Sequence, residues 1–352
     1  MQESKNRYIN VYVGVGIGIL VLGYSKILPE TFKIWVEAFV LLLFFTAAGV
    51  YGRESGISEL GMMDLIKKGA REIMIPYCWM SLLVVTGRCA GMLLFPIRFT
   101  KEDTIVMIWD MLSFYGGSVL WFLPVFFVGV TAYWTIRKKL FYPVALILTA
   151  VLAAVICGIN GIPVYLYGKE MSVEVFLLQC IYTVWRGCVG MFFCAVGEGL
   201  SMLLGYLERK KLMMILLGFA LTGIGTLLAL KNQEKADVTL SFRYLLTGEM
   251  VFWFLAAIFL CGGLLFLCRW INECRPLEYL GRSSLIVLAT CLDFKVTALA
   301  GLAGDKVFAI FDHDFLRNVV MLVVLIVVEL FLIWLFHGVF SFMYGKKRRI
   351  TD

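Results

Sequence analysis

The sequence predicts an all-α integral membrane protein with about ten transmembrane helices in one bundle. Of its 352 residues, 61% are hydrophobic and only 16% are charged, which is far more apolar than a soluble domain. The mean hydropathy is +0.89. Apolar segments of about 20 residues recur along the chain, and each is long enough to cross a roughly 30 Å hydrocarbon core as a helix. Helices also satisfy their own backbone hydrogen bonds, as the bilayer interior requires.

Ten segments meet this length criterion. They are residues 8–28, 33–51, 73–95, 118–136, 141–160, 174–205, 212–230, 249–268, 283–302 and 315–342. The first has no small-residue cleavage pattern of a signal peptide, so we expect it to remain as a helix. The sixth is longer than a straight crossing needs and is expected to be bent or tilted. Because no fixed-period repeat and no long polar loop interrupts the series, residues 1–352 are predicted to form a single membrane domain.

The loops predict the orientation. Lys and Arg concentrate in alternate loops and at both termini, and the positive-inside rule places that more basic side in the cytoplasm. Both termini are therefore expected to be cytoplasmic. Residues 56–70, "GISELGMMDLIKKGA", mix apolar and charged positions, which is typical of an amphipathic helix lying at the cytoplasmic interface.

Five charged residues fall within predicted spans, where an ionised side chain costs roughly 3 kcal/mol on insertion scales. These buried polar candidates are Arg88, Arg186, Glu198, Lys295 and Glu329. Each could belong to a functional site, or could pair internally and fix helix packing. A lysine near a helix end, such as Lys295, could instead extend its amine to the interface.

Other site chemistries find little support in the sequence. The ten cysteines contain no C-x-x-C pair and mostly lie in apolar runs, which favours small buried side chains over a disulfide framework. With two histidines in the chain, no metal site is predicted, and no bound cofactor is expected. The net charge of +7 reflects loop topology and is not accompanied by a nucleic-acid motif, so the expected partner is the lipid bilayer and not nucleic acid.

Four stretches together resemble the acyltransferase-3 family of multispanning membrane enzymes, in the branch similar to fucose O-acetylases. They are "RYINVYVGVGIGILVLGYS" at 7–25, "LIKKGAREIMIPY" at 65–77, "LWFLPVFF" at 120–127 and "LEYLGRSSLIVLATCLDF" at 277–294. The resemblance implies a multi-pass protein of a bacterial cell membrane. It also implies O-acetylation of a cell-envelope polysaccharide or of another small hydroxyl acceptor, with acyl-CoA, such as acetyl-CoA, as the donor from the cytoplasm.

The chain departs from the family pattern at its functional positions. Val13 stands where the family has a basic residue in the first helix, and Tyr24 replaces the histidine taken to be the catalytic base. Val40 and Cys291 occupy two further histidine positions. Imidazole accepts a proton near neutral pH, whereas a tyrosine has an ordinary pKa of about 10. Tyr24 is therefore expected to be a hydrogen-bond donor lining a pocket, and Cys291 a buried apolar side chain, with thiolate chemistry as the alternative.

The resemblance keeps part of a cytoplasmic basic surface. Lys67, Lys68, Arg71 and Arg282 are the candidates for binding the phosphates of acyl-CoA, and simple positive-inside anchoring is the alternative for the first three. Three functions remain open from the sequence: an acyltransferase with an altered site, a catalytically inactive relative that binds a ligand or a partner, and a transporter.

Overall fold

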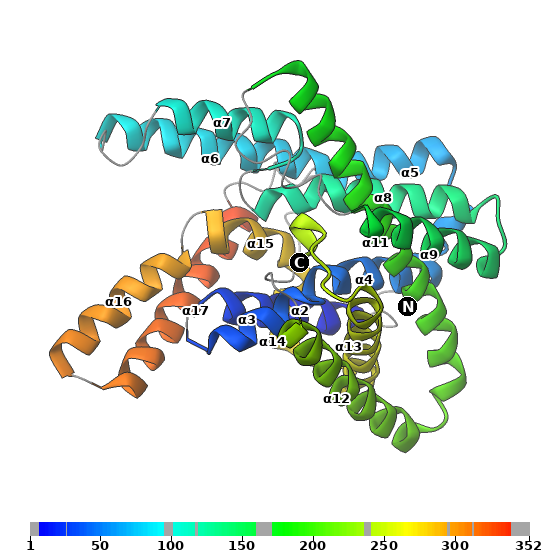
Figure 1. Ribbon diagram of the computed structural model, residues 1–352. Helices are drawn as coiled ribbons and strands as arrows, with labels where there is room; N and C mark the ends of the chain where they lie inside the picture. The colour runs from blue at the N-terminus through cyan, green and yellow to red at the C-terminus, as the bar shows by residue number, and fades with distance from the viewer. Residues whose placement is uncertain are drawn as a thin grey trace.

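The molecule is built from helices, as the sequence predicts (Figure 1). This computed structural model describes residues 7–25, 27–94, 101–116, 119–159, 171–235, 241–293, 296–311 and 313–338. Within these ranges the only β pairing is one isolated bridge between Ser241 and Leu246. The all-α class is confirmed.

The α-helices follow one another with short connections. In chain order they are α2 (Arg7–Tyr24), α3 (Glu30–Glu37), α4 (Val40–Glu54), α5 (Met62–Gly69), α6 (Ile75–Leu94), α7 (Lys101–Leu112), α8 (Phe122–Arg137), α9 (Tyr142–Gly158), α11 (Val173–Leu207), α12 (Lys211–Lys235), α13 (Met250–Ile271), α14 (Arg275–Arg282), α15 (Ser284–Asp293), α16 (Val296–Phe311) and α17 (Asp314–Gly338). Three short 3₁₀ turns at Ile57–Glu59, Val119–Trp121 and Phe242–Tyr244 complete the series.

Eight of the helical segments in the described residues are long and apolar enough to cross a membrane. The predicted span 283–302 is instead a pair of helices, Ser284–Cys291 and Val296–Phe311, bent by 60°, and counting this pair as one crossing gives nine. The predicted span 141–160 is the apolar helix α9, which has 17 residues. A polytopic membrane architecture follows from these lengths and compositions.

The connector at 56–70 contains the predicted amphipathic helix, and this helix is continuous with the span that follows it. Its second half is α5, which continues through a π-helical turn at Ala70–Met74 directly into α6. Met62–Met92 is thus one 31-residue apolar segment. A π-helical turn contains about one residue more than an α-helical turn, so it rotates the side chains of α6 relative to those of α5.

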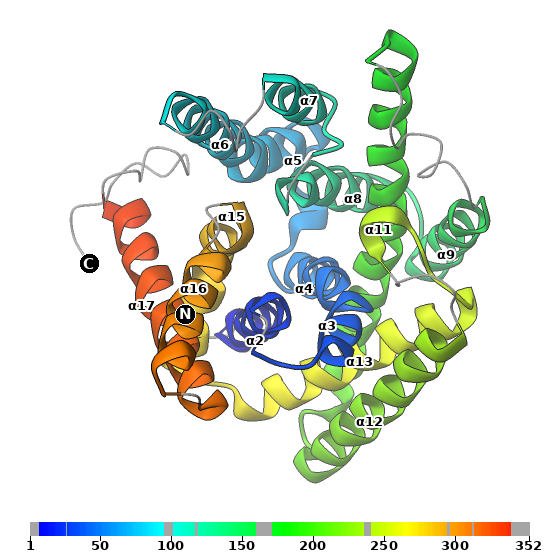
Figure 2. The same cartoon turned by 60° about the vertical axis from the view of Figure 1, so that its left-hand side comes forward.

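The centre of the fold is formed by α2, α4, α11 and α13, and the pairs α6–α7 and α16–α17 extend away from it (Figures 1 and 2). Helices α2 and α4 are antiparallel. Tyr8 near the start of α2 donates a hydrogen bond to Glu54 at the end of α4, and Gly16 further along α2 contacts Leu43 near the start of α4. Their shared interior is almost entirely apolar.

Glycines bring the central helices into backbone contact. A Cβ atom at Gly49 would lie 2.0 Å from the carbonyl oxygen of Cys194, and one at Gly197 would lie 2.1 Å from that of Thr46. The α4–α11 contact is therefore closed from both sides. Small residues at a helix crossing allow the two backbones to come into direct contact. This is a common way for membrane helices to associate.

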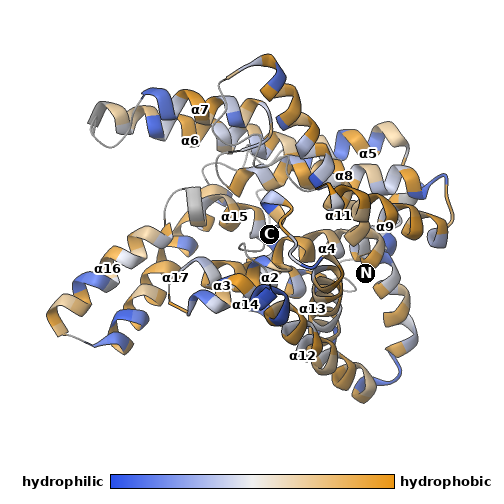
Figure 3. Cartoon of the chain, in the orientation of Figure 1, coloured by the Kyte–Doolittle hydropathy of each residue, from blue (hydrophilic) through white to orange (hydrophobic). Residues whose placement is uncertain are grey.

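The outer helices are rich in apolar residues (Figure 3), and many of their large apolar side chains are exposed. On α9 the exposed residues Val144, Ile147, Val151 and Val155 form one stripe, while the opposite face packs on α11. A stripe of this size would be costly in water, and it is the normal lipid-facing surface of a membrane helix.

The glycine contact predicts a specific stability loss. Gly197→Ala should lower the free energy of unfolding by about 1–3 kcal/mol, because the added methyl group overpacks the α4 backbone. Gly205 lies on the same helix with nothing within 4 Å of its Cβ position, so Gly205→Ala should be neutral or stabilising by up to about 1 kcal/mol. Thermal unfolding of both variants in detergent tests this, and equal melting temperatures would contradict it.

Candidate functional site

A cavity of about 530 Å³ opens at the C-terminal end of α2, and we call it the Tyr24 cavity. Its walls come from α2, α3, α4 and the two 3₁₀ turns Val119–Trp121 and Phe242–Tyr244. Its charged and hydrogen-bonding side chains include Tyr24, Lys33, Glu37 and Arg243. The cavity combines aromatic surface with hydrogen-bonding groups, which is the usual composition of a small-molecule site.

Tyr24 and Glu37 are joined in this cavity. The Tyr24 hydroxyl donates a hydrogen bond of 3.1 Å to Oε1 of Glu37. Helix α3 holds the carboxylate in place, because Trp35 donates from Nε1 to Thr226 on α12 at 3.1 Å and Val36 packs against Gly23 of α2. Tyr24 thus lines a cavity and donates a hydrogen bond within it.

Arg243 reaches the cavity from a distant part of the chain. Its turn is closed by reciprocal backbone hydrogen bonds of 2.9 Å between Ser241 and Leu246. The guanidinium Nη2 donates to the carbonyl oxygen of Gly116 at 2.5 Å. The contact joins segments 127 residues apart in sequence, and it places a cation at the cavity wall that no local sequence signal predicts.

Gly116 is in turn held by α7. The backbone N–H of Gly116 donates to the carbonyl oxygen of Asp110, and Gln179 donates from Nε2 to the Asp110 carboxylate at 3.1 Å. Burial raises the pKa of the Asp110 carboxyl, and the hydrogen bond from Gln179 opposes part of that rise. The segment that receives Arg243 is thus fixed by a partly buried polar contact.

Arg186 lies behind the cavity wall in a cage of aromatic rings. Its guanidinium carbon is 4.6 Å from the ring centroid of Trp121, 5.1 Å from that of Tyr182 and 5.2 Å from that of Tyr115. The side chain is fully buried, and its Nη2 donates to Thr183 at 3.0 Å. Cation–π contacts of this kind stabilise a desolvated cation, so Arg186 orients Trp121, which lines the Tyr24 cavity.

A second cavity of about 370 Å³ lies at the other end of the same two helices, and we call it the Lys68 cavity. Its polar lining includes Asn10 from α2, Lys68 from α5, Glu72 from the π-helical turn and Ser284 from α15. Val13 also lines it. Val13 and Tyr24, the two first-helix positions that the family resemblance singles out, therefore face different cavities.

One aromatic layer separates the two cavities. Trp121 lines the Tyr24 cavity, whereas Phe44 and Phe126 line the Lys68 cavity. The Phe122 ring contacts all three, with centroid distances of 6.1 Å to Trp121, 5.7 Å to Phe44 and 5.5 Å to Phe126. Phe122 therefore contacts rings that line each of the two cavities.

The other residues singled out by the resemblance divide between the cavities and the protein interior. Val40 lines the Tyr24 cavity, and Lys68 lines the cavity named after it. Lys67 and Arg71 are exposed beside the Lys68 cavity but are not part of its lining. Arg282 is also exposed, with Nη2 4.0 Å from Glu278.

Cys291 is fully buried and lines neither cavity, as expected for a small apolar side chain. All ten cysteines are free. Within the described part of the chain no group of three or more His, Cys, Asp or Glu side chains is placed to hold a metal ion.

The charged residues predicted within spans mostly have partners. Arg88 pairs with Asp103 at 3.5 Å, and buried Glu329 accepts a hydrogen bond of 2.8 Å from Thr290. Lys295 lies outside the described residues.

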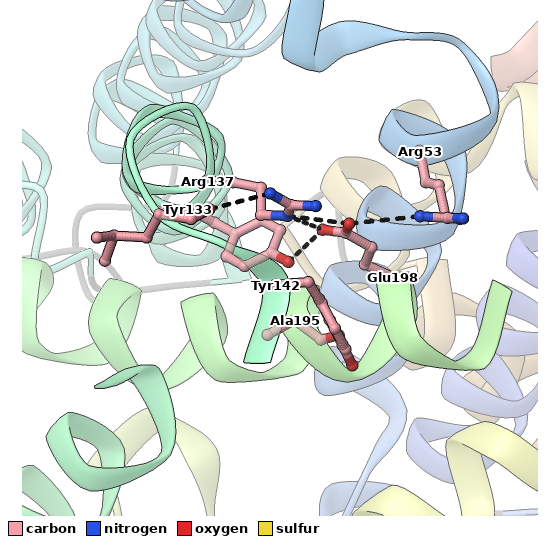
Figure 4. A network of polar contacts seen from close by, with 7 residues as sticks. Arg53, Tyr133, Arg137, Tyr142, Ala195 and Glu198 are labelled. Atoms are coloured by element: carbon pink, nitrogen blue, oxygen red, sulfur yellow. Dashed lines mark hydrogen bonds and ion pairs between the residues drawn. The ribbon is translucent and has the colours of Figure 1, made fainter. Parts of the chain in front are cut away.

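Glu198 is the centre of a structural network at the end of α4 and α8 (Figure 4). Arg137 donates from Nε to both carboxylate oxygens at 3.0 and 3.1 Å, and the Tyr133 hydroxyl donates to Oε2 at 2.5 Å. Arg53 on α4 lies 3.6 Å away. Glu198 is 2% exposed and lines neither cavity, so its charge ties three helices together and does not face a ligand site.

Comparison with models of protein families, with curated proteins and with solved structures finds no significant match. Two cavity residues escaped the sequence analysis. Glu37 lies inside the predicted span 33–51 and carries the same signal as Glu198 and Glu329, a carboxylate in an apolar run. Arg243 lies in a predicted loop, where a cation has no special meaning before the turn is folded against Gly116.

Removal of the central carboxylate should destabilise the network more than removal of one outer arginine. Glu198→Ala leaves the partly buried Arg137 without its anionic partner and should cost about 3–5 kcal/mol. Arg53→Ala removes a pair whose arginine side chain is 40% exposed and should cost less than about 1 kcal/mol. Thermal unfolding in detergent measures both, and similar losses for the two variants would show that the network is not organised around Glu198.

Proposed function

We propose that this chain is a membrane acyltransferase of the acyltransferase-3 type, which transfers an acyl group from acyl-CoA to a hydroxyl of a glycan or small envelope acceptor. The observation that carries the proposal is the pair of cavities at opposite ends of α2 and α4, separated by one aromatic layer. A transferase that takes its donor from one side of a membrane and its acceptor from the other requires a binding site that is accessible from each side.

We further propose ten crossings with both termini in the cytoplasm of a bacterial cell. The lipid-facing stripe on α9 supports a crossing by that 17-residue helix, and the bent pair α15–α16 supplies another. A count of ten puts the N-terminus of α2 and the C-terminus of α4 on the more basic side. The Lys68 cavity then opens toward the cytoplasm, where acyl-CoA is made.

The donor site in this proposal is the Lys68 cavity. Lys68 offers an ammonium group to a CoA phosphate, and the exposed Lys67 and Arg71 beside it add positive charge near the entrance. The pantetheine arm is long and narrow, and it would carry the thioester past Phe122 toward the Tyr24 cavity once that ring rotates.

The acceptor site is the Tyr24 cavity. Trp121 and Phe242 supply aromatic faces, on which the apolar face of a sugar ring can stack. Glu37 and Arg243 supply an acceptor and a donor for hydroxyl groups. A polyhydroxylated ligand fits these two kinds of surface better than a purely apolar one.

A non-catalytic relative is the second candidate. Its supporting observation is that no histidine lines either cavity, so the family's usual proton acceptor is missing from both. In that case the cavities would bind acyl-CoA, a lipid-linked sugar or a partner protein without turnover. Two cavities with one aromatic layer between them would also suit a transporter, in which case the ligand would cross the membrane unchanged.

Acetyl-CoA separates these candidates. Purified protein in lipid nanodiscs should bind acetyl-CoA and release CoA from it in the presence of a methyl glycoside, with the acetyl group recovered on the sugar. Lys68→Gln should weaken CoA binding about tenfold, because it removes one charge-assisted phosphate contact. Lys210→Gln is the matched control, because Lys210 is an exposed lysine in the connection between α11 and α12 and lines neither cavity. Calorimetry measures the affinities, and absence of both binding and turnover in the wild type would contradict the proposal.

The topology also makes a direct prediction. Single cysteines at Lys5 and Lys346 in a cysteine-free background should both resist a membrane-impermeant maleimide in intact cells and react after lysis. A cysteine at Lys33, at the opposite end of the first helices, should react in intact cells. Labelling of only one terminus in intact cells would show an odd number of crossings.

A further inference from the structure

Glu37 is a carboxylate at the edge of an apolar core that forms no salt bridge with the residues that the structure describes. Its one hydrogen bond within the described residues comes from the Tyr24 hydroxyl at 3.1 Å, and no ion pair includes it. Lys33, the cation nearest in sequence, pairs with Glu30 at 2.9 Å instead. A charge held in a membrane helix without a salt bridge is costly, and such residues normally serve a site.

Glu37 is also the single acidic side chain among the described residues that line the Tyr24 cavity. Tyr24 occupies only Oε1, so the second oxygen stays available to a ligand. By contrast, Glu198 uses both oxygens on Arg137 and Tyr133 and faces no cavity. Both residues are glutamates within apolar segments. The Glu198 carboxylate is fully used in structural contacts, whereas the Glu37 carboxylate faces a cavity.

From this geometry we propose that Glu37 is the proton acceptor for the incoming hydroxyl, and that Tyr24 orients its carboxylate. The inference rests on the proposed acyltransferase function and assigns the group that this chain would use in place of a histidine. Tyr24 is a positioning residue, because its hydroxyl contacts the carboxylate and holds one rotamer of it.

The step balances with the reactants that the proposal already names. The acceptor hydroxyl oxygen forms a bond to the thioester carbonyl carbon while its proton passes to the Glu37 carboxylate. The tetrahedral intermediate then collapses, the carbon–sulfur bond breaks, and the CoA sulfur leaves with the electron pair. Return of the proton from Glu37 to that sulfur gives CoA thiol, an ester and the original carboxylate.

The two histidines and Cys291 are not part of the Tyr24 cavity lining, although Cys291 lies near enough to Tyr24 to interact with it electrostatically. Cys291 is buried and lines neither cavity. His337 contacts the carbonyl oxygen of Ile333 near the end of α17, and His313 lies in the connection before α17. Neither histidine is part of the cavity lining. Glu37 is therefore the carboxylate that can contact both the acceptor hydroxyl and the donor thioester in the Tyr24 cavity.

The surroundings of Glu37 define how its titration should be measured. The titratable and charged groups around it are Tyr24 from α2, Glu30 and Lys33 from α3 itself, and Arg243 and Tyr244 from the Phe242–Tyr244 turn. Helix α4 contributes the apolar Val40 and Leu41 to the cavity, and α12 contributes Thr226 through Trp35. Because several titratable groups surround Glu37, the specific evidence for its role is a fall in kcat at acid pH that is present in the wild type and absent in Glu37→Gln.

The test uses full-length protein in nanodiscs, with acetyl-CoA as donor and methyl α-glucopyranoside or water as the probe acceptor. Glu37→Gln should lower kcat by about 10²–10⁴-fold with unchanged CoA affinity, and its residual rate should lack the acid limb that the wild type shows as the carboxylate protonates. Glu37→Asp should recover part of the rate. Tyr24→Phe should shift the acid limb and lower kcat by less than Glu37→Gln does.

Glu234→Gln is the matched control, because Glu234 is exposed near the end of α12 and lines neither cavity. Its rate should equal that of the wild type. Wild-type turnover that survives Glu37→Gln would overturn the role of Glu37 and leave the acyltransferase function standing. Binding of acetyl-CoA without any wild-type turnover would overturn the role of Glu37 and favour a non-catalytic relative, and absence of both binding and turnover would overturn the acyltransferase function itself.

Discussion

Backbone contact between glycine-bearing helices is the constraint on which the rest of this structure depends. Gly49 and Gly197 close the α4–α11 contact, and Gly14 and Gly281 close the α2–α14 contact in the same way, with added Cβ atoms 2.0 Å from the facing carbonyl oxygens. Because α2 and α4 supply walls to both cavities, these contacts set the spacing of the whole site. Lipid offers no hydrophobic drive for association, so close fit supplies the attraction.

Charge is used sparingly inside this framework, and each buried charge has its own environment. Glu198 is neutralised by Arg137 and joins three helices. Arg186 lies among aromatic rings that replace water around its guanidinium. Glu37 accepts a hydrogen bond from the Tyr24 phenol and faces a cavity that Lys33 and Arg243 also line. The Glu198 network joins helices, the Arg186 cage is enclosed by the protein, and Glu37 alone of the three lines a cavity.

In the proposed reaction, the aromatic rings around Phe122 would keep the donor and the acceptor in separate cavities. Phe122 contacts rings that line each cavity, so the two cavities are close to one another without being continuous. A donor held at Lys68 and an acceptor held at Glu37 would then meet only after that layer moves. Separation of this kind would protect a thioester from water until the acceptor hydroxyl is in place.

The sequence by itself determined the class of the molecule and most of its helices, because composition and the length of apolar runs are local properties that the bilayer selects directly. It also picked out Glu198, Arg186 and Glu329 as costly charges. Only the tertiary structure decided which charges are paired and which face a cavity. Tyr24 meets Glu37 through the turn between α2 and α3, and Arg243 arrives from far along the chain through Gly116. Such contacts depend on how the helices pack against one another. The packing of segments that are distant in the chain produces no periodic pattern in a single sequence.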